Sequence, residues 1–154
     1  MSCIATKDML KGKLALALCG VHDSGKTGTL LRLIDRCREG GYKELTSIPP
    51  TKGGTNDRIV VLEDAQDASF RVGISTGGDA PKAIAKGFAV FNEFDCKLVI
   101  LPTRSTGRTW DEFKNQCESA RYDYKWCWKK RCPCKTFDEV NNQIADALFM
   151  WLQK

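Results

Sequence analysis

The chain has 154 residues, which is the size of one domain, 1–154, built around a single core. Hydrophobic residues make up 42% and charged residues 28%, which excludes an intrinsically disordered chain. The formal net charge of +5 suits nucleotides and other anionic ligands, and does not by itself require nucleic acid.

The cysteine and histidine counts are less ordinary. There are eight cysteines and one histidine, His22, which excludes zinc sites built on several imidazoles. The apolar run 14–19 is too short for a secretion signal, and no stretch approaches the ~18 apolar residues of a membrane helix. We therefore expect a cytoplasmic protein without a membrane partner, whose cysteines are thiols.

The first half of the chain predicts a strand, a helix and a loop. Residues 13–19 form a continuous apolar run, typical of a strand buried on both faces of a parallel sheet. Residues 26–38 carry a helical apolar stripe, and Gly40-Gly41 supplies the stop. Residues 43–58 lack periodicity and contain two prolines and two glycines, so they predict a long loop.

Two β-rich runs follow, 58–63 and 70–75. The six residues between them are too few for a parallel crossover, so the two runs predict an antiparallel hairpin. Asp79 is then expected to cap a helix that has Pro81 in its first turn and an apolar stripe behind it.

The last third predicts two more strands and two more helices. Residues 97–101 form a strand that we expect Pro102 to end, and Thr109 opens a capping box for the next helix. Residues 122–129 alternate aromatic and polar side chains, which predicts a strand near the sheet edge. A second capping box at Thr136 precedes a final helix.

Strands that alternate with helices indicate an α/β fold. We expect a three-layer sandwich with a mostly parallel five-stranded sheet, in which the strand 58–63 runs against the others.

The segment between the first strand and the first helix carries a motif with a chemical meaning. Residues 20–27 read G-V-H-D-S-G-K-T, which matches G-x-x-x-x-G-K-T. The glycines let successive backbone N–H groups point at phosphate oxygens. Lys26 brings a positive charge to the β- and γ-phosphates, and the Thr27 hydroxyl is a ligand for Mg²⁺. The following helix directs its positive dipole end at the same anion.

On this motif the chain resembles the P-loop NTPase superfamily, and most of all its nucleotide and small-molecule kinase branch. The resemblance implies that ATP and magnesium bind at this loop. The absence of the guanine-reading N-K-x-D pattern favours ATP over GTP. His22 is interpreted as a tolerated variable position, with a proton acceptor as the alternative. The residues expected to contact the nucleotide here are Gly20, His22, Asp23, Ser24, Gly25, Lys26, Thr27 and Gly28.

The superfamily also places an acid near the metal, and two stretches compete for this role. One is Glu63-Asp64, which follows four aliphatic residues, and the other is Asp79. If the strands 13–19, 70–75 and 97–101 are parallel, the end of 70–75 faces the phosphates. The hairpin then puts Glu63 and Asp64 at the opposite edge. We therefore predict Asp79 as the magnesium acid, with a pure helix-capping role as the alternative.

The resemblance further implies that arginines after the fourth core strand stabilise the transferring phosphoryl group. The matching residues are Arg104 and Arg108, for which a solvated basic loop is the alternative. Lys130 and Arg131 lie in the loop between the last predicted strand and helix. In many kinases of the superfamily this loop borders the nucleotide base, so the resemblance implies that Lys130 or Arg131 packs on adenine. The catalytic set predicted from the sequence is therefore Lys26, Asp79, Arg104 and Arg108.

The segment 117–135 is rich in cysteine and in aromatic and basic residues. Its spacing lacks the C-x₂-C knuckles of zinc sites, so unligated thiols of lowered pKa are favoured over a Cys₄ site. Its alternating aromatic residues favour a packed strand face over base stacking. The cysteines concerned are Cys117, Cys127, Cys132 and Cys134.

Three functions remain open from the sequence. The first is a small phosphotransferase or NTPase acting on the γ-phosphate of ATP, whose small-molecule acceptor contacts Lys52, Gly53 and Gly54 in the loop 43–58. The second is a regulatory nucleotide-binding module that works with a partner protein. The third is a small nucleic-acid-associated ATPase.

Overall fold

A computed structural model of the chain describes residues 12–20, 26–48, 58–77, 81–104 and 107–129. The side chains at 20, 26–27 and 126–129 are outside this description. The predicted final helix and its capping box at Thr136 also lie outside the described residues. Among the described helices, none is long and apolar enough to cross a membrane.

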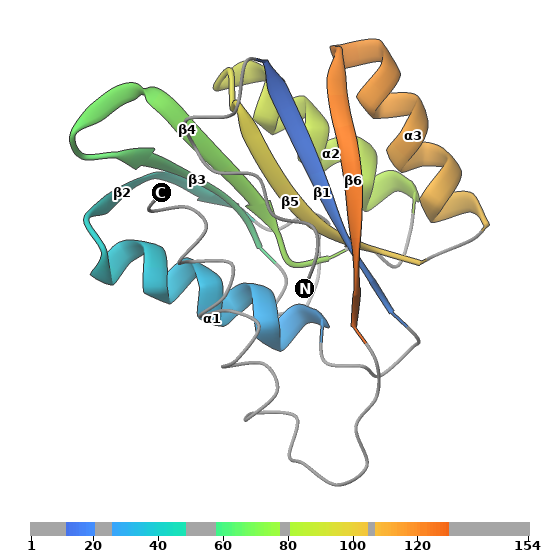
Figure 1. The fold of residues 1–154 in the computed structure, drawn as a ribbon, viewed down its shortest axis with the longest axis horizontal. Helices are drawn as coiled ribbons and strands as arrows, with labels where there is room; N and C mark the ends of the chain where they lie inside the picture. The colour runs from blue at the N-terminus through green and yellow to red at the C-terminus, as the bar shows by residue number, and fades with distance from the viewer. Residues whose placement is uncertain (1–11, 21–25, 49–57, 78–80, 105–106, 130–154) are drawn as a thin grey trace, which may run out of the picture.

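The described residues form six strands and three helices, an α/β fold (Figure 1). In chain order they are β1 (Lys13–Gly20), α1 (Lys26–Glu39), β2 (Tyr42–Ile48), β3 (Ile59–Asp64), β4 (Asp67–Ser75), α2 (Pro81–Glu93), β5 (Leu98–Thr103), α3 (Arg108–Ala120) and β6 (Tyr122–Lys129).

The strands form one mixed sheet in the order β2-β3-β4-β5-β1-β6. β1 pairs in parallel with both β5 and β6, and β4 pairs in parallel with β5. β3 is antiparallel to both β2 and β4. As predicted, β3 is thus the one strand among those described that runs against the others.

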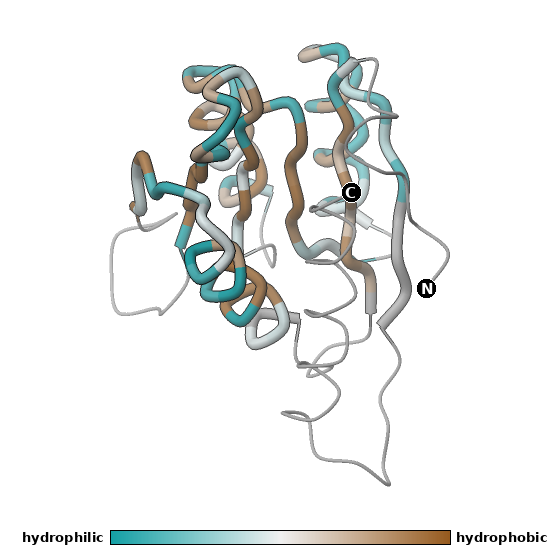
Figure 2. The backbone as a smooth tube through the Cα atoms, turned by 60° about the vertical axis from the view of Figure 1, so that its left-hand side comes forward, coloured by the Kyte–Doolittle hydropathy of each residue, from teal (hydrophilic) through white to brown (hydrophobic). Residues whose placement is uncertain are grey.

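Helices cover both faces of the sheet, so the described part has the three layers that the sequence predicts (Figure 1). On one face, the apolar side of α1 packs on β1, β4 and β5 through buried residues such as Leu30, Leu33 and Ile34. On the other face, α2 and α3 contribute Phe88 and Phe113 to a second cluster. Figure 2 shows the resulting hydropathy: the central strands are mostly apolar, whereas the helices alternate apolar and polar segments.

Most of the predicted elements are confirmed. α1 ends one residue beyond the predicted limit, and Gly41 follows it at a φ of 98°, a conformation that favours glycine. β3 and β4 form the predicted hairpin, longer than expected because the strands continue to a two-residue turn at Ala65-Gln66. β6 lies at the sheet edge, as its alternating pattern predicts.

The prediction of a loop over 43–58 and of five strands was wrong, because residues 42–48 form β2. β2 is an edge strand, so only some of its side chains are covered, and its buried residues do not alternate regularly. A register shift between Glu44 and Thr46 breaks the two-residue period further. The remaining loop residues with Lys52, Gly53 and Gly54 lie outside the described part of the chain.

Two predicted boundaries were also wrong. Pro102 does not end β5, because proline removes a single backbone donor and pairing continues to Thr103, which faces Cys19 of β1. Thr109 is not the cap of α3. The helix begins at Arg108 after Gly107, whose φ of 88° is a glycine conformation, and no side chain caps it. The Thr109 hydroxyl instead accepts a hydrogen bond from the backbone N–H of Arg104 at 3.3 Å.

Candidate functional site

The carboxyl ends of β1, β4, β5 and β6 meet at one edge of the sheet, because these four strands share one direction. We call this edge the carboxyl edge. Ligands of open α/β sheets bind outside this edge, where the connections to the following helices lie. β3 runs the other way and begins here, and the backbone of Arg58 exchanges two hydrogen bonds with Thr76, at 2.8 and 2.9 Å.

The flanks of the G-x-x-x-x-G-K-T motif both belong to described elements. Gly20 is the last residue of β1, and Lys26 is the first residue of α1. Gly28 is half-buried in the first turn of α1, followed by the buried Thr29. The other predicted nucleotide contacts between these flanks, His22, Asp23, Ser24 and Gly25, lie outside the described residues, as do the side chains of Lys26 and Thr27.

Buried polar side chains end the strands at the carboxyl edge. Cys19 and Thr103 are both 1% exposed, and the Cys19 Sγ lies 3.3 Å from the Thr103 Oγ1. Ser75 and Thr76 are fully buried at the end of β4, where the Ser75 hydroxyl donates to the carbonyl of Gly77 at 3.1 Å. The strand ends thus form a polar, hydrogen-bonded floor beneath the connections. Sequence reasoning missed this floor, although Thr103 and Ser75 each end an apolar run.

The competition between the two acidic stretches can be judged from strand direction. β4 is parallel to β5, and β5 is parallel to β1, so the premise of the sequence argument holds. Glu63 and Asp64 lie at the opposite edge, in the β3–β4 hairpin. Glu63 accepts a hydrogen bond from the Arg71 Nε at 3.2 Å, and Asp64 accepts one from the backbone N–H of Gln66 at 3.0 Å. Both acids thus have structural partners there.

Asp79 lies outside the described residues, in the connection from the end of β4 to the start of α2. The strand directions bring that connection and the start of α1 to the same edge. Asp79 and Thr27 both carry oxygen donors, the ligand type that Mg²⁺ prefers, and their role as magnesium ligands stays a prediction. No group of three or more metal-ligating side chains occurs among the described residues.

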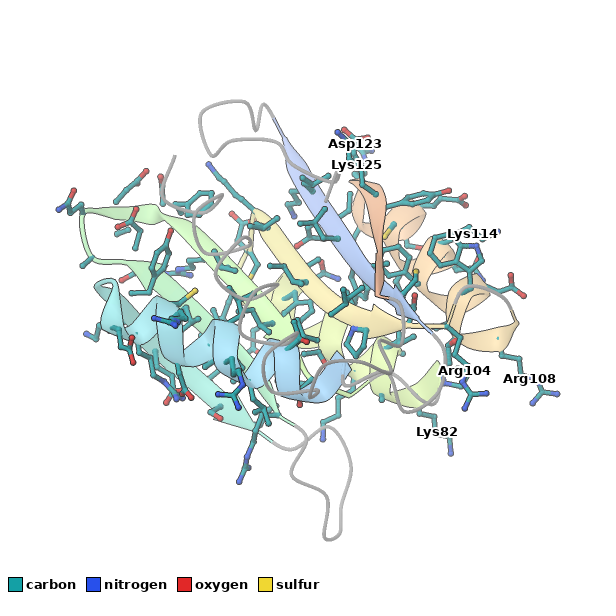
Figure 3. All side chains as sticks on the ribbon, turned by 60° about the horizontal axis from the view of Figure 1, so that its bottom comes forward. Lys82, Arg104, Arg108, Lys114, Asp123 and Lys125 are labelled. Carbon is teal, nitrogen blue, oxygen red and sulfur yellow. The ribbon has the colours of Figure 1, made fainter. Side chains whose placement is uncertain are left out.

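Arg104 and Arg108 lie at the carboxyl edge, as expected. Arg104 follows β5 directly and Arg108 begins α3, and both side chains are exposed. Figure 3 shows them extending outward from the ends of their elements, next to Lys82 at the start of α2. Their predicted catalytic role stays a prediction. Lys130 and Arg131 lie outside the described residues.

The described cysteines are free thiols, as predicted: Cys19, Cys37, Cys96 and Cys117. A lowered pKa at Cys117 was a wrong prediction, because this residue of α3 is buried and desolvation raises the pKa of its thiol to about 12. The side chains of Cys127, Cys132 and Cys134 lie outside the described residues.

The burial of three cysteine thiols makes the stability of the folded protein depend on pH in the alkaline range. It raises the thiol pKa values of Cys37, Cys96 and Cys117 to about 12, from about 9. The folded state therefore holds these protons more tightly than the unfolded state. Their stabilising effect is complete below pH 9 and is lost as the pH rises towards 12. We expect the urea midpoint to stay constant from pH 7 to 8.5 and to fall by pH 10. The fall should be smaller in Cys117→Ala, and an equal fall in that variant would contradict the assignment.

Comparison of the chain with protein-family models, with curated proteins and with solved structures gives no match. A functional assignment therefore depends on the motif and on the geometry around it.

Proposed function

We propose that the protein is a P-loop NTPase that binds MgATP at residues 20–28 and transfers or hydrolyses its γ-phosphate. One observation carries the proposal: the G-x-x-x-x-G-K-T motif connects the end of a buried strand, β1, to the start of a helix, α1. This strand–loop–helix context is what the phosphate-binding reading of the motif requires.

The position of β1 supports the proposal. Because β1 lies between the parallel strands β5 and β6, its end is fixed on both sides. The loop that follows is thus anchored to a rigid part of the sheet. α1 is 14 residues long, so its N-terminus carries the partial positive charge that favours a phosphate.

In this proposal Lys26 contacts the β- and γ-phosphates, and Thr27 and Asp79 hold the magnesium ion. The metal supplies neutralisation of the charge that develops on the phosphate oxygens. Thr103, Ser75 and Thr76 provide a polar floor at the ends of the neighbouring strands. Because these hydroxyls are buried and hydrogen-bonded within the protein, they hold the strand ends in place beneath the connections.

Removing the Lys26 ammonium tests the proposal. Wild-type protein with MgATP at 100 times its Kd should gain about 2.7 kcal/mol of stability, seen as a rise in melting temperature. We expect Lys26→Ala to lose this rise, because the cation facing the β- and γ-phosphates is gone. Differential scanning fluorimetry with and without MgATP measures both values, and calorimetric titration gives the Kd.

Lys97→Ala is the matched control. Lys97 is exposed at the start of β5, at the edge opposite the motif, and loses the same charge when it is replaced. Its melting temperature should rise with MgATP as in the wild type. Undiminished stabilisation of Lys26→Ala by MgATP would refute the site, and absence of any effect on the wild type would refute ATP binding.

A further inference from the structure

Three exposed cations at the carboxyl edge have no acidic partner within the described part of the chain. They are Lys82 in the first turn of α2, Arg104 after β5 and Arg108 at the start of α3. We call these three side chains the basic rim. No ion pair joins any of them to a described carboxylate.

Several cations elsewhere in the described structure are paired with acids, and what sets the rim apart is that its three unpaired cations lie together at one edge. Lys13 lies 3.3 Å from Asp95, and Arg71 lies 3.2 Å from Glu63. Arg36 and Arg38 pair with acids of α1 and β2 in the same way. Such pairs balance charge locally, whereas the rim leaves three positive charges facing solvent.

The packing of α2 against α3 gathers the rim in one place. The rings of Phe88 in α2 and Phe113 in α3 lie 6.0 Å apart, which holds the two helices together on one face of the sheet. Both helices begin at the carboxyl edge. Figure 3 shows the rim side chains from these helix ends and from the end of β5, directed away from the body of the protein.

The described acids closest in sequence to Arg108 have other partners. Asp111 lies 3.9 Å from the Lys114 Nζ, and Glu112 accepts a hydrogen bond from Gln116 at 2.9 Å. The partial positive charge at the N-termini of α2 and α3 adds to that of the rim. Among the described side chains at these helix ends, positive charges therefore outnumber negative ones.

The exposure of the rim decides which anion it suits. An exposed ion pair contributes about 0–1 kcal/mol, so a single small phosphate would be held weakly here. A polymer of phosphates adds several such contacts and releases its condensed counterions, which makes the sum large. A membrane surface would also need an apolar side chain to insert, and the exposed described residues at these helix ends are charged or glycine.

From these observations we infer that the basic rim binds the phosphate backbone of a nucleic acid. The inference goes beyond the proposed ATP site, because the rim would bind the polymer in the absence of nucleotide. Contacts to phosphate carry no sequence information, so the interaction is expected to be independent of base sequence.

Fluorescence anisotropy of a labelled 20-nucleotide single strand, measured without ATP, tests the inference. Three phosphate contacts predict that log K falls with log salt concentration with a slope of about −2. We expect the triple variant Lys82→Glu, Arg104→Glu, Arg108→Glu to lose affinity about tenfold or more at 50 mM salt, and its slope to approach zero.

A triple variant with the same change in net charge is the control: Lys43→Glu, Lys97→Glu and Lys125→Glu. These lysines are exposed and lie away from the rim, and Figure 3 shows Lys125 beside Asp123 and apart from the three rim side chains. It should keep most of the wild-type affinity. Circular dichroism checks that both triple variants fold. If the rim variant with three glutamates does not fold, the variant with glutamine at the same three positions replaces it.

Three results would overturn the inference: no binding by the wild type, an equal loss in both triples, or binding to anionic phosphatidylserine vesicles in preference to the strand. The ATP experiment with Lys26→Ala uses a different ligand and a different variant. Failure of the rim therefore leaves the proposed ATP site standing, and failure of the ATP site leaves the rim standing.

Discussion

Replacing Phe88 with alanine is expected to lower the free energy of unfolding by about 3–5 kcal/mol. The Phe88 side chain is fully buried between α2, α3 and the sheet. Its ring centroid lies 5.9 Å from that of Phe91, 6.0 Å from that of Phe113 and 5.7 Å from that of Tyr122, each in an edge-to-face arrangement. Alanine would remove three aromatic contacts and leave a cavity that the rigid sheet cannot close.

Urea denaturation followed by circular dichroism measures this loss as a shift of the midpoint at constant slope. Phe94→Ala is the matched control, because Phe94 is only partly buried at the end of α2. That variant should lose clearly less stability. If a domain of ordinary stability does not survive the first change, Phe88→Leu should fold and give a smaller loss. Equal losses for Phe88→Ala and Phe94→Ala would contradict the packing described.

Gly73→Ala is expected to destabilise the protein by about 1–3 kcal/mol through overpacking. A Cβ at Gly73 in β4 would lie 2.3 Å from the Cδ1 and 2.5 Å from the Cε1 of the Phe91 ring. That ring is fully buried and held by Phe88, so it cannot move aside without disturbing its neighbours. The close approach of helix and strand at this point requires glycine for steric reasons.

Gly87→Ala is a control with the opposite expected sign. A Cβ at Gly87 would lie 3.6 Å from the Phe91 ring, which is an ordinary contact, and alanine favours the helix by up to about 1 kcal/mol. The double variant Gly73→Ala, Phe91→Leu should be more stable than the sum of the single changes predicts, because the smaller side chain relieves the clash. Additive losses, measured by urea denaturation, would show that the clash is not the cause.

The sequence was informative where one physical signal dominates. The apolar run 14–19 has no polar break, and only a strand covered on both faces buries such a run. The hairpin followed from the short gap between two β-rich runs. β2 could not be predicted, because an edge strand with a register shift shows neither an apolar run nor a regular alternation. The start of α3 was misplaced because the φ of Gly107, a property of the backbone alone, sets it.

The candidate site could be predicted only in part. The motif at 20–27 is local in sequence, so its position at a strand end was readable. The placement of Glu63 and Asp64 at the edge opposite the motif could also be predicted, because it follows from chain direction alone. The hydroxyl floor of Thr103 and Ser75 was not, since it depends on strand order, and strand order is set by contacts between distant residues. The lack of an acidic partner for Lys82 among the described residues depends on the same tertiary packing.

The place of β1 in the sheet has a consequence for biosynthesis. β2, β3 and β4 are successive neighbours and can pair soon after they leave the ribosome. Of the described strands β1 is made first, yet its partners come late: Cys19 and Thr103, which contact each other, are 84 residues apart in the chain. Until β5 is synthesised, the apolar β1 has no partner strand and is open to chaperones or to misassembly. The segment proposed to bind phosphate thus follows the first of the described strands, and the pairing of that strand is among the last to be completed.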